Sequence, residues 1–307
     1  MSHSSRNAYL YLCIVFTLWG SLYVVSGFVM EKIPTFTACF LRFVIAFAAL
    51  TLMTRGRKKI HIEKSDYKYL FLLGILGYFL SVDLQFLGTK YAGSGMASLL
   101  NSLNPIVITI LGAFLLKEKM TFGKILGMLL SVTGVYLILG GGSAVSKVGI
   151  ILSLMSVAGW SFMSVMTRKA LQKYDSLQIT RYGIMIAMFC NLPVCMCELH
   201  GNASAVTFDF SYIIGLLYMG IFCTGVSYIL WNKSLMLLEA GTCSAFYPVQ
   251  PLVSTVLGIL FLHEKTTVSF VVGASFIVVG VLSGILIKQN PAGRYMSLSD
   301  LCKRSIQ

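Results

Sequence analysis

Long stretches of apolar residues follow one another along almost the whole chain, and short polar segments separate them. Within each stretch the apolar residues run on continuously, without the alternation that marks the strands of a membrane barrel, so the pattern predicts helices. A helix needs about 20 such residues to cross the hydrocarbon core of a bilayer. We therefore predict an all-α fold with ten membrane spans, at residues 8–29, 34–53, 68–89, 94–116, 122–140, 148–168, 176–197, 211–235, 242–262 and 268–288.

The composition changes this picture little, because it is that of an integral membrane protein. Of the 307 residues, 57% are hydrophobic and only 11% are charged, whereas a soluble domain carries about 25% charged residues. The net charge of +13 would suggest a nucleic-acid partner for a soluble protein. In a membrane protein, basic residues set the topology instead. We expect the lipid bilayer as a partner and no nucleic acid.

The distribution of basic residues gives the orientation of the spans. If the N-terminus lies inside, most of the 24 Lys and Arg residues fall on inner segments, which is the bias that cytoplasmic loops show. The outer segments then hold only Lys32, Lys90, Lys147 and Lys265. We expect a multi-pass protein of the cytoplasmic membrane with both termini in the cytoplasm.

One sequence unit occurs twice in the chain. Residues 94–127 and 240–273 align without a gap at an offset of 146, which pairs Pro105 with Pro251. Five spans per unit is an odd number, so the second unit must enter the membrane in the opposite direction. The loop after the second span, RGRKKIHIEK, is strongly basic, whereas its counterpart ELHGNASAVTFD has no Lys or Arg. The sequence thus predicts two inverted five-helix repeats.

Short motifs within the two units give a resemblance to a known family. They are LWGS in the first span, FLRF in the second, and the pattern Pro…Gly…(Lys/His)-Glu-Lys-x-Thr that closes the fourth and ninth spans. Together they resemble the EamA family of the drug/metabolite transporter superfamily, over nearly the whole chain. The resemblance implies one repeat at residues 8–141, a second at 148–288, and a short cytoplasmic tail at 289–307.

The resemblance also implies a function. Such proteins are similar to bacterial exporters of amino acids and other small metabolites, so we expect a secondary transporter that works by alternating access. Its solute is a small molecule, with protons as a second candidate partner and no cofactor. The resemblance implies a central cavity lined by spans 1–4 and 6–9, with spans 5 and 10 outside it.

Two prolines lie near the predicted midplane, about eleven residues into their helices. Pro105 and Pro251 each remove a backbone donor and push away the carbonyl four residues earlier, and a freed carbonyl in hydrocarbon needs a partner. We interpret the pair either as two helix breaks that face one another across a solute site, or as packing kinks satisfied by neighbouring helices. The polar side chains at these breaks are candidate solute ligands: Asn101, Asn104, Tyr247 and Gln250.

Three charged residues fall inside predicted spans: Arg42, Asp83 and Arg181. Each costs about 2.5–3.5 kcal/mol at a helix centre on insertion scales, so we expect them to face a cavity or one another. Arg181 is near enough to the inner face to reach lipid phosphates. Asp83 is the one carboxylate well inside a span. It is a candidate for proton coupling or contact with a solute amine, and the alternative is a structural pair with Arg42.

Aromatic side chains with polar tips also lie inside the spans: Trp19, Tyr23, Tyr78, Trp160, Tyr228 and Trp231. Trp19 and Trp160 occupy comparable places in the two units. These side chains are suited to a cavity for a mostly apolar, zwitterionic or aromatic solute. The alternative is an interfacial aromatic belt, which many-helix membrane proteins have.

Small residues and paired glutamates suggest packing roles. Gly123 and Gly127 in the fifth span, like Gly280 and Gly284 in the tenth, permit close helix approach. We assign two further residues, which pair at the repeat offset, to the turns after the fourth and ninth spans: Glu118 and Glu264.

An enzyme is disfavoured by the placement of the histidines. All of them lie in predicted loops or tails: His3, His61, His200 and His263. The eight cysteines show no metal spacing, and GGGS lacks the lysine of a phosphate-binding loop. We therefore expect no catalytic residues and no metal site. The remaining alternative to a transporter is a non-transporting membrane sensor or a lipid scramblase.

Overall fold

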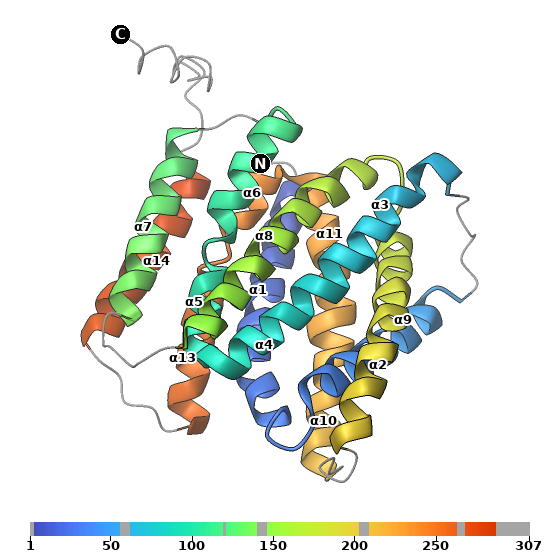
Figure 1. Ribbon diagram of the computed structural model, residues 1–307. Helices are drawn as coiled ribbons and strands as arrows, with labels where there is room; N and C mark the ends of the chain where they lie inside the picture. The colour runs from blue at the N-terminus through green and yellow to red at the C-terminus, as the bar shows by residue number, and fades with distance from the viewer. Residues whose placement is uncertain are drawn as a thin grey trace.

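The computed structural model describes residues 3–55, 62–118, 121–139, 146–202, 209–262 and 268–286. These residues form helices joined by short turns, and no strand occurs among them. Most helices run roughly along one direction, as Figure 1 shows. The prediction of an all-α protein is therefore confirmed for the described part of the chain.

The first half of the chain follows the predicted apolar segments. Pro34 directly precedes the second helix with an extended ψ of 148°, and Gly93, at a φ of 83°, makes the sharp turn between two helices. The elements are α1 (His3–Val29), α2 (Thr35–Met53), η1 (Lys64–Asp66), α3 (Tyr67–Phe71), η2 (Leu72–Ser81), α4 (Val82–Ala92), α5 (Ser94–Asn101), α6 (Asn104–Leu115) and α7 (Phe122–Leu139).

The second half repeats this order. Ser146 begins it by capping the first helix, where its Oγ accepts from Gly149 N at 3.4 Å. The elements are α8 (Lys147–Ala170), α9 (Ser176–Asn202), α10 (Phe210–Tyr218), η4 (Met219–Val226), α11 (Ser227–Leu237), α12 (Ala240–Ser244), α13 (Val249–Leu262) and α14 (Val268–Leu286).

Many of these helices are built to cross a membrane. Within the described residues, seven helical segments are long and apolar enough to span a bilayer. They are Arg6–Met30, Thr35–Met53, Lys64–Ala92, Lys147–Ala170, Ser176–His200, Phe210–Leu237 and Ala240–Phe261. Shorter apolar helices occur at Asn104–Leu115, Phe122–Gly134 and Val271–Gly280. The chain is therefore a multi-pass membrane protein.

The third helical segment of each half contains a widened, π-helical stretch. These stretches are η2 and η4, and each lies between two α-helical parts of the same segment. Hydroxyl groups fill the wider turns: Ser81 Oγ donates to Leu76 O at 2.5 Å, and Thr224 Oγ1 donates to Met219 O at 2.7 Å. Such stretches often occur at functional sites, and both of these lie beside the cavity described below.

The helices α7 and α14 pack mainly against each other, and Figure 1 shows them side by side at one edge of the molecule. Their contact depends on glycine. A Cβ atom on Gly280 would lie 2.8 Å from Gly127 O and 2.9 Å from Ser131 N, so only glycine permits this approach. The predicted packing role of Gly127 and Gly280 is confirmed, whereas the side chains around Gly284 lie outside the described residues.

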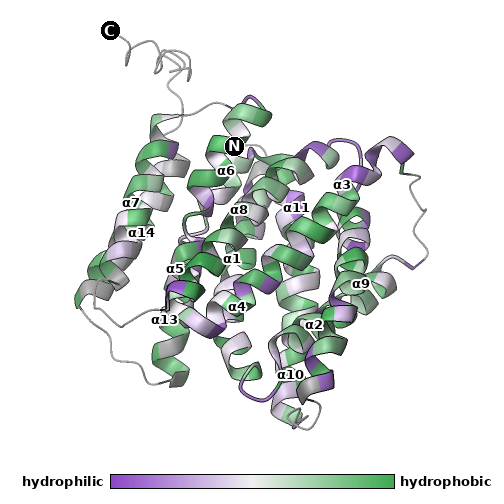
Figure 2. Ribbon diagram, viewed as in Figure 1, coloured by the Kyte–Doolittle hydropathy of each residue, from purple (hydrophilic) through white to green (hydrophobic). Residues whose placement is uncertain are grey.

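The surface is strongly apolar, and the mainly hydrophobic interior also holds many polar side chains. Large apolar side chains such as Phe210 (77% exposed) and Phe122 (72% exposed) point outward, and Figure 2 shows hydrophobic residues along most helices. Many polar side chains are buried between the helices, among them Asn104, Ser161 and Asn232. Buried polar side chains inside an apolar surface fit a protein that handles a polar ligand within the bilayer.

Candidate functional site

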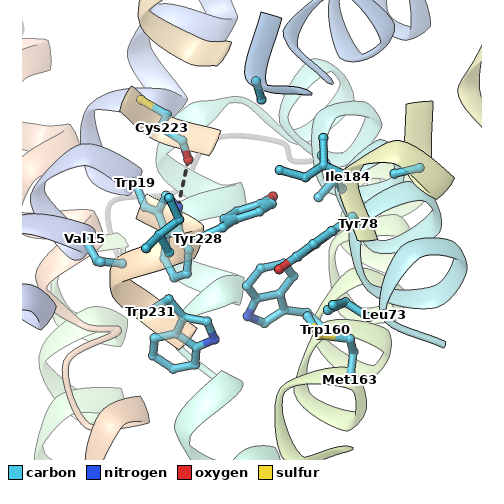
Figure 3. Close-up of a cluster of buried hydrophobic side chains, with 14 of the residues drawn as sticks. Val15, Trp19, Leu73, Tyr78, Trp160, Met163, Ile184, Cys223, Tyr228 and Trp231 are labelled. Atoms are coloured by element: carbon cyan, nitrogen blue, oxygen red, sulfur yellow. Dashed lines mark hydrogen bonds between the residues drawn. The ribbon is translucent and has the colours of Figure 1, made fainter. Parts of the chain in front are cut away.

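Aromatic rings from both halves of the chain meet at the centre of the molecule. Trp19 on α1 packs edge-on against Trp160 on α8, with ring centroids 5.5 Å apart. Tyr78 in η2 stacks on Tyr228 in α11 at 4.4 Å, and Trp231 lies 5.6 Å from Trp19. Figure 3 shows these rings turned toward one another. All of them are buried, so the alternative of an interfacial aromatic belt is wrong for these residues.

A small cavity lies among these rings. Its walls come from α1, α2, α4, α5, α8, α11 and α13 and from the turn before α13. Both halves of the chain therefore contribute to it. The lining residues are Trp19, Leu22, Tyr23, Arg42, Gln85, Asn101, Trp160, Tyr228, Tyr247 and Gln250.

Most of the candidate residues named from the sequence line this cavity, and the others lie around it. Tyr78 and Trp231 do not line the cavity; they pack behind the lining residues Tyr228 and Trp19. Leu22 and Gln85 were not predicted. The one signal for Gln85 was a polar residue inside an apolar stretch, two positions after Asp83.

The two proline positions are breaks between helices. α5 ends at Asn101 and α6 begins at Asn104, with Pro105 at its first turn, where a missing N–H costs nothing. In the second half, α12 ends at Ser244 and α13 begins at Val249. The helix that contains Pro251 is thus separated from its predecessor by a short turn.

The freed carbonyls are not open to a ligand, because the protein itself supplies the partner that each was expected to need. Asn104 Nδ2 donates to Asn101 O at 2.8 Å. Gln250 N donates to Tyr247 O at 2.9 Å. The chain satisfies both carbonyls locally, because each break is followed by a residue whose N–H group folds back on it. Side chains, and not backbone oxygens, are left to face the cavity.

Hydrogen bonds between the two halves hold the cavity walls in place. Ser161 Oγ on α8 donates to Asn104 Oδ1 at 2.8 Å. The indole N–H of Trp160 donates to the Tyr247 hydroxyl, and Trp19 Nε1 donates to Cys223 O at 3.1 Å, the dashed line in Figure 3. Each bond joins elements from different halves or different helices, so the ring positions are set by polar contacts as well as packing.

Arg42 supplies the one charge on the cavity wall among the described lining residues. Its side chain is 1% exposed. The Nε atom donates to Thr224 Oγ1 at 2.9 Å, and the guanidinium carbon lies 5.0 Å from the centre of the Phe86 ring. The Nη1 atom has no hydrogen-bond partner in the described structure. A guanidinium so placed can receive a carboxylate or another oxyanion through its free N–H groups.

Two further polar atoms at the cavity lack partners within the described residues. They are the Tyr23 hydroxyl and Gln250 Oε1, both on buried side chains. Buried polar groups are almost always hydrogen-bonded, and each exception asks for an explanation. A polar ligand in this cavity would be within reach of all three of these atoms.

Asp83 lies outside the lining, behind Arg42. Its Oδ1 accepts from Asn191 Nδ2 on α9 at 3.0 Å, and its side chain is 4% exposed. No ion pair joins Asp83 to Arg42 in the described part of the chain, where the ion pairs connect other residues. The structural pair considered from the sequence is therefore wrong. Arg42 turns toward Thr224 and Phe86 instead, and Asp83 turns toward α9.

Arg181 is also engaged by the protein. Its Nη1 donates to Thr54 Oγ1 at 2.9 Å, at the end of α2, and its guanidinium lies 5.2 Å from the Tyr182 ring. Arg181 is not part of the cavity lining.

Glu118 does more than end a turn. It is ion-paired with Arg168 of α8, and its two oxygens accept from Ala240 N at 3.0 Å and Gly241 N at 3.2 Å. It therefore binds the N-terminus of α12, which is the counterpart of α5 in the second half. A negative charge at this position is stabilised by the helix dipole. Lys124 and Glu239 form a second ion pair beside it. We call this set of contacts the Glu118 closure.

The equivalent position in the first half is open. A Cβ atom on Gly241 would meet Thr109 Oγ1 at 3.2 Å, whereas a Cβ atom on Gly95, its repeat partner, would meet nothing within 4 Å. Glu264, the repeat partner of Glu118, lies outside the described residues. Among the described residues, these two glycines therefore differ in how closely they are packed.

A polytopic helical fold whose two halves enclose a buried, aromatic and polar cavity is the architecture of a membrane transporter. The sequence matches the EamA-like transporter family twice, at residues 6–140 and 147–285. The chain therefore belongs to this family, as the motifs indicated.

Relatives and a solved structure agree with this assignment. An uncharacterized transporter of Archaeoglobus fulgidus is 28% identical over 276 residues, covering 88% of this chain and 95% of the relative. The uncharacterized transporter YetK of Bacillus subtilis is 27% identical, covering 93% of this chain and 88% of the relative. One crystal structure of a protein superposes with a TM-score of 0.76 at 19% identity, over 94% of this chain and 99% of that one.

Proposed function

We propose that this protein is a secondary transporter that carries a small organic solute across the cytoplasmic membrane by alternating access. The solute is amphipathic and carries a carboxylate, as an amino acid does, and the direction is export, as the family resemblance implies. The observation that carries the proposal is the unpaired Nη1 of Arg42 on the wall of a buried aromatic cavity. The rings offer apolar contact and the guanidinium offers a site for the anion.

Alternating access rests on the two halves. We propose two inverted five-helix repeats, at residues 8–141 and 148–288, with ten spans and both termini in the cytoplasm. The difference between the two ends supports this scheme, since the Glu118 closure is formed while the region of Gly95 is open. A transporter that is closed at one end and open at the other has the geometry that alternating access requires.

The topology is tested by accessibility labelling of single cysteines placed at Lys58 and at Asn202. The inverted arrangement predicts that the two positions react from opposite sides of the membrane. If both react from the same side, the second repeat is not inverted, and the proposed mechanism falls with it.

The function is tested by counterflow in proteoliposomes with radiolabelled amino acids, amines and nucleobases. We expect uptake of carboxylate-bearing solutes by the wild type and at least a tenfold loss in Arg42→Gln, because a charge-assisted hydrogen bond contributes about 1.5–3 kcal/mol. Arg181→Gln is the matched control, since it removes an arginine from a span without touching the cavity. Equal losses in both variants would refute the role of Arg42.

The same assay separates the alternative functions. A sensor shows no counterflow with any solute, and a lipid scramblase moves labelled lipid between leaflets without solute counterflow. Either result would overturn the transporter proposal.

A further inference from the structure

The side chains of Asp83 on α4 and Asn191 on α9 are joined by a hydrogen bond, and each has one buried oxygen that takes no part in it. Asn191 Nδ2 donates to Asp83 Oδ1 at 3.0 Å. The other oxygen of each side chain, Asp83 Oδ2 and Asn191 Oδ1, is buried and has no hydrogen-bond partner among the described residues. Asp83 is 4% exposed and Asn191 is fully buried. The pair therefore contains one donated hydrogen bond and two unsatisfied oxygens, which is costly in the interior of a protein.

A single proton removes this deficit. A protonated carboxyl group has one O–H donor beside its acceptor oxygen, so a neutral Asp83 can accept from the amide and donate to it at the same time. We propose that Asp83 and Asn191 form a proton-binding site, and that a proton bound there favours binding of a carboxylate at Arg42. The second half of the inference rests on the proposed function, whereas the proton site does not.

The titratable and charged groups nearest to Asp83 come from α2 and α9. Cys39 of α2 places its thiol against the carboxyl group of Asp83. The positive charge of Arg42 on α2 and the negative charge of Glu198 on α9 interact with this carboxyl group at longer range. Glu198 is held elsewhere, because it accepts from Thr37 N at 2.8 Å and from Phe36 N at 3.2 Å.

The other helices packed on α4 bring no charge close to Asp83. α5 has no titratable side chain, and those of α8 lie at its two ends. The hydroxyl of Tyr78 in η2 accepts from Asn232 at 3.4 Å, away from α4. Tyr23 of α1 lines the cavity.

A metal cation fits this site poorly. Hard cations bind about six or more oxygen ligands, and the described structure offers two unpaired oxygens with a thiol beside them. The guanidinium of Arg42 also lies one helical turn away, over the ring of Phe86, and Phe86 is three residues after Asp83 on the same face of α4. A proton needs only the two oxygens that are present.

The same placement links the proton to the solute. An ionised Asp83 close behind Arg42 lowers the positive potential that a solute carboxylate meets, and a neutral Asp83 restores it. Proton and anion therefore bind more tightly together than alone. Coupling between two sites in one protein typically changes affinity by about 5- to 150-fold, and we expect about tenfold here.

The proton site is tested by infrared spectroscopy of the purified full-length protein in lipid nanodiscs at neutral pH. We expect a carbonyl band of a protonated carboxylic acid that is absent in Asp83→Asn. In Asn191→Leu the band should move to higher frequency, because the acid loses its hydrogen bonds to the amide. Asp66→Asn is the control: it removes a carboxylate already bonded to Lys173 and Tyr174, so the band should stay.

Absence of the band from the wild type would overturn the proton site. If sodium raises the thermal stability of the wild type but not that of Asp83→Asn, the site binds a metal cation and the proposal is wrong. Elution of Asp83→Asn as a monodisperse peak shows that it folds, and Asn191→Leu gives a second, independent readout.

The linkage is tested by the binding of 3-phenylpropionate, an aromatic carboxylate without an amine, at pH 6 and pH 8. We expect about tenfold tighter binding to the wild type at the lower pH and no pH dependence in Asp83→Asn, which is neutral throughout. Arg42→Gln should lose the binding and keep the infrared band. The band without any binding would refute the proposed solute class alone; pH-independent binding to the wild type would refute the linkage.

Discussion

Replacing Glu118 by glutamine should loosen one end of the molecule. The substitution keeps the size of the side chain but removes its charge, so the ion pair with Arg168 is lost and the bonds from Ala240 N and Gly241 N are weakened. The Glu118 side chain is 6% exposed and that of Arg168 is 20% exposed, so solvent screens the pair only in part. We expect a cost of about 2 kcal/mol to the closed state, which changes the ratio of closed to open molecules by roughly 30-fold.

A native cysteine reports on this change. Cys243 lies in α12, two positions after Gly241, which Glu118 binds, and it is fully buried. The rate at which a membrane-permeant maleimide modifies it, followed by mass spectrometry of the peptide, should rise in Glu118→Gln roughly in proportion to the open population. Cys223 is an internal reference, because it is buried in η4, away from this end.

Glu31→Gln serves as the matched control, since it removes an exposed carboxylate near the end of α1. Equal rates of Cys243 modification in the wild type and in Glu118→Gln would show that the Glu118 closure does not hold this end shut. A parallel rise at Cys223 would indicate general unfolding and would equally refute the reasoning.

Two further substitutions test the packing. Gly280→Val should separate α7 from α14, because its Cβ would lie 2.8 Å from Gly127 O; we expect a loss of about 1–3 kcal/mol, seen as a lower thermal midpoint in detergent, with Ser275→Val on the exposed face of α14 as the control. Asn104→Ala should leave Asn101 O without its 2.8 Å donor and Ser161 Oγ without its acceptor. We expect about 1–3 kcal/mol of destabilisation, and an unchanged midpoint would contradict the structural role of Asn104.

The sequence predicted features that depend on local chemistry or on the repeat. The proline positions, the small residues that let α7 and α14 approach, and the buried aromatic side chains are all visible in the residue pattern. The position of Arg42 at the cavity could be anticipated for the same reason, because a charge within a span has few other places to lie.

Contacts between helices could not be read in the same way. The partner of Asp83 is Asn191, which is 108 positions away along the chain, and the choice of Asn191 over Arg42 depends on how α2, α4 and α9 are rotated about their axes. Which group would reach the freed carbonyls was not visible for a related reason. The proline pattern concerns the backbone alone, whereas the side chain of Asn104 folds back on Asn101 O.

The contrast between Gly241 and Gly95 connects the repeat to the mechanism. The two segments match in part, and we interpret the difference in their packing among the described residues as a property of the state. In the described structure, Glu118 holds the N-terminus of α12, and Gly241 is closely packed against Thr109. The N-terminus of α5 carries the exposed Gly95 at the position that corresponds to Gly241. Because both segments end at a helix break beside the cavity, alternating access as proposed would move both breaks relative to Arg42 without a change in the internal fold of the two halves.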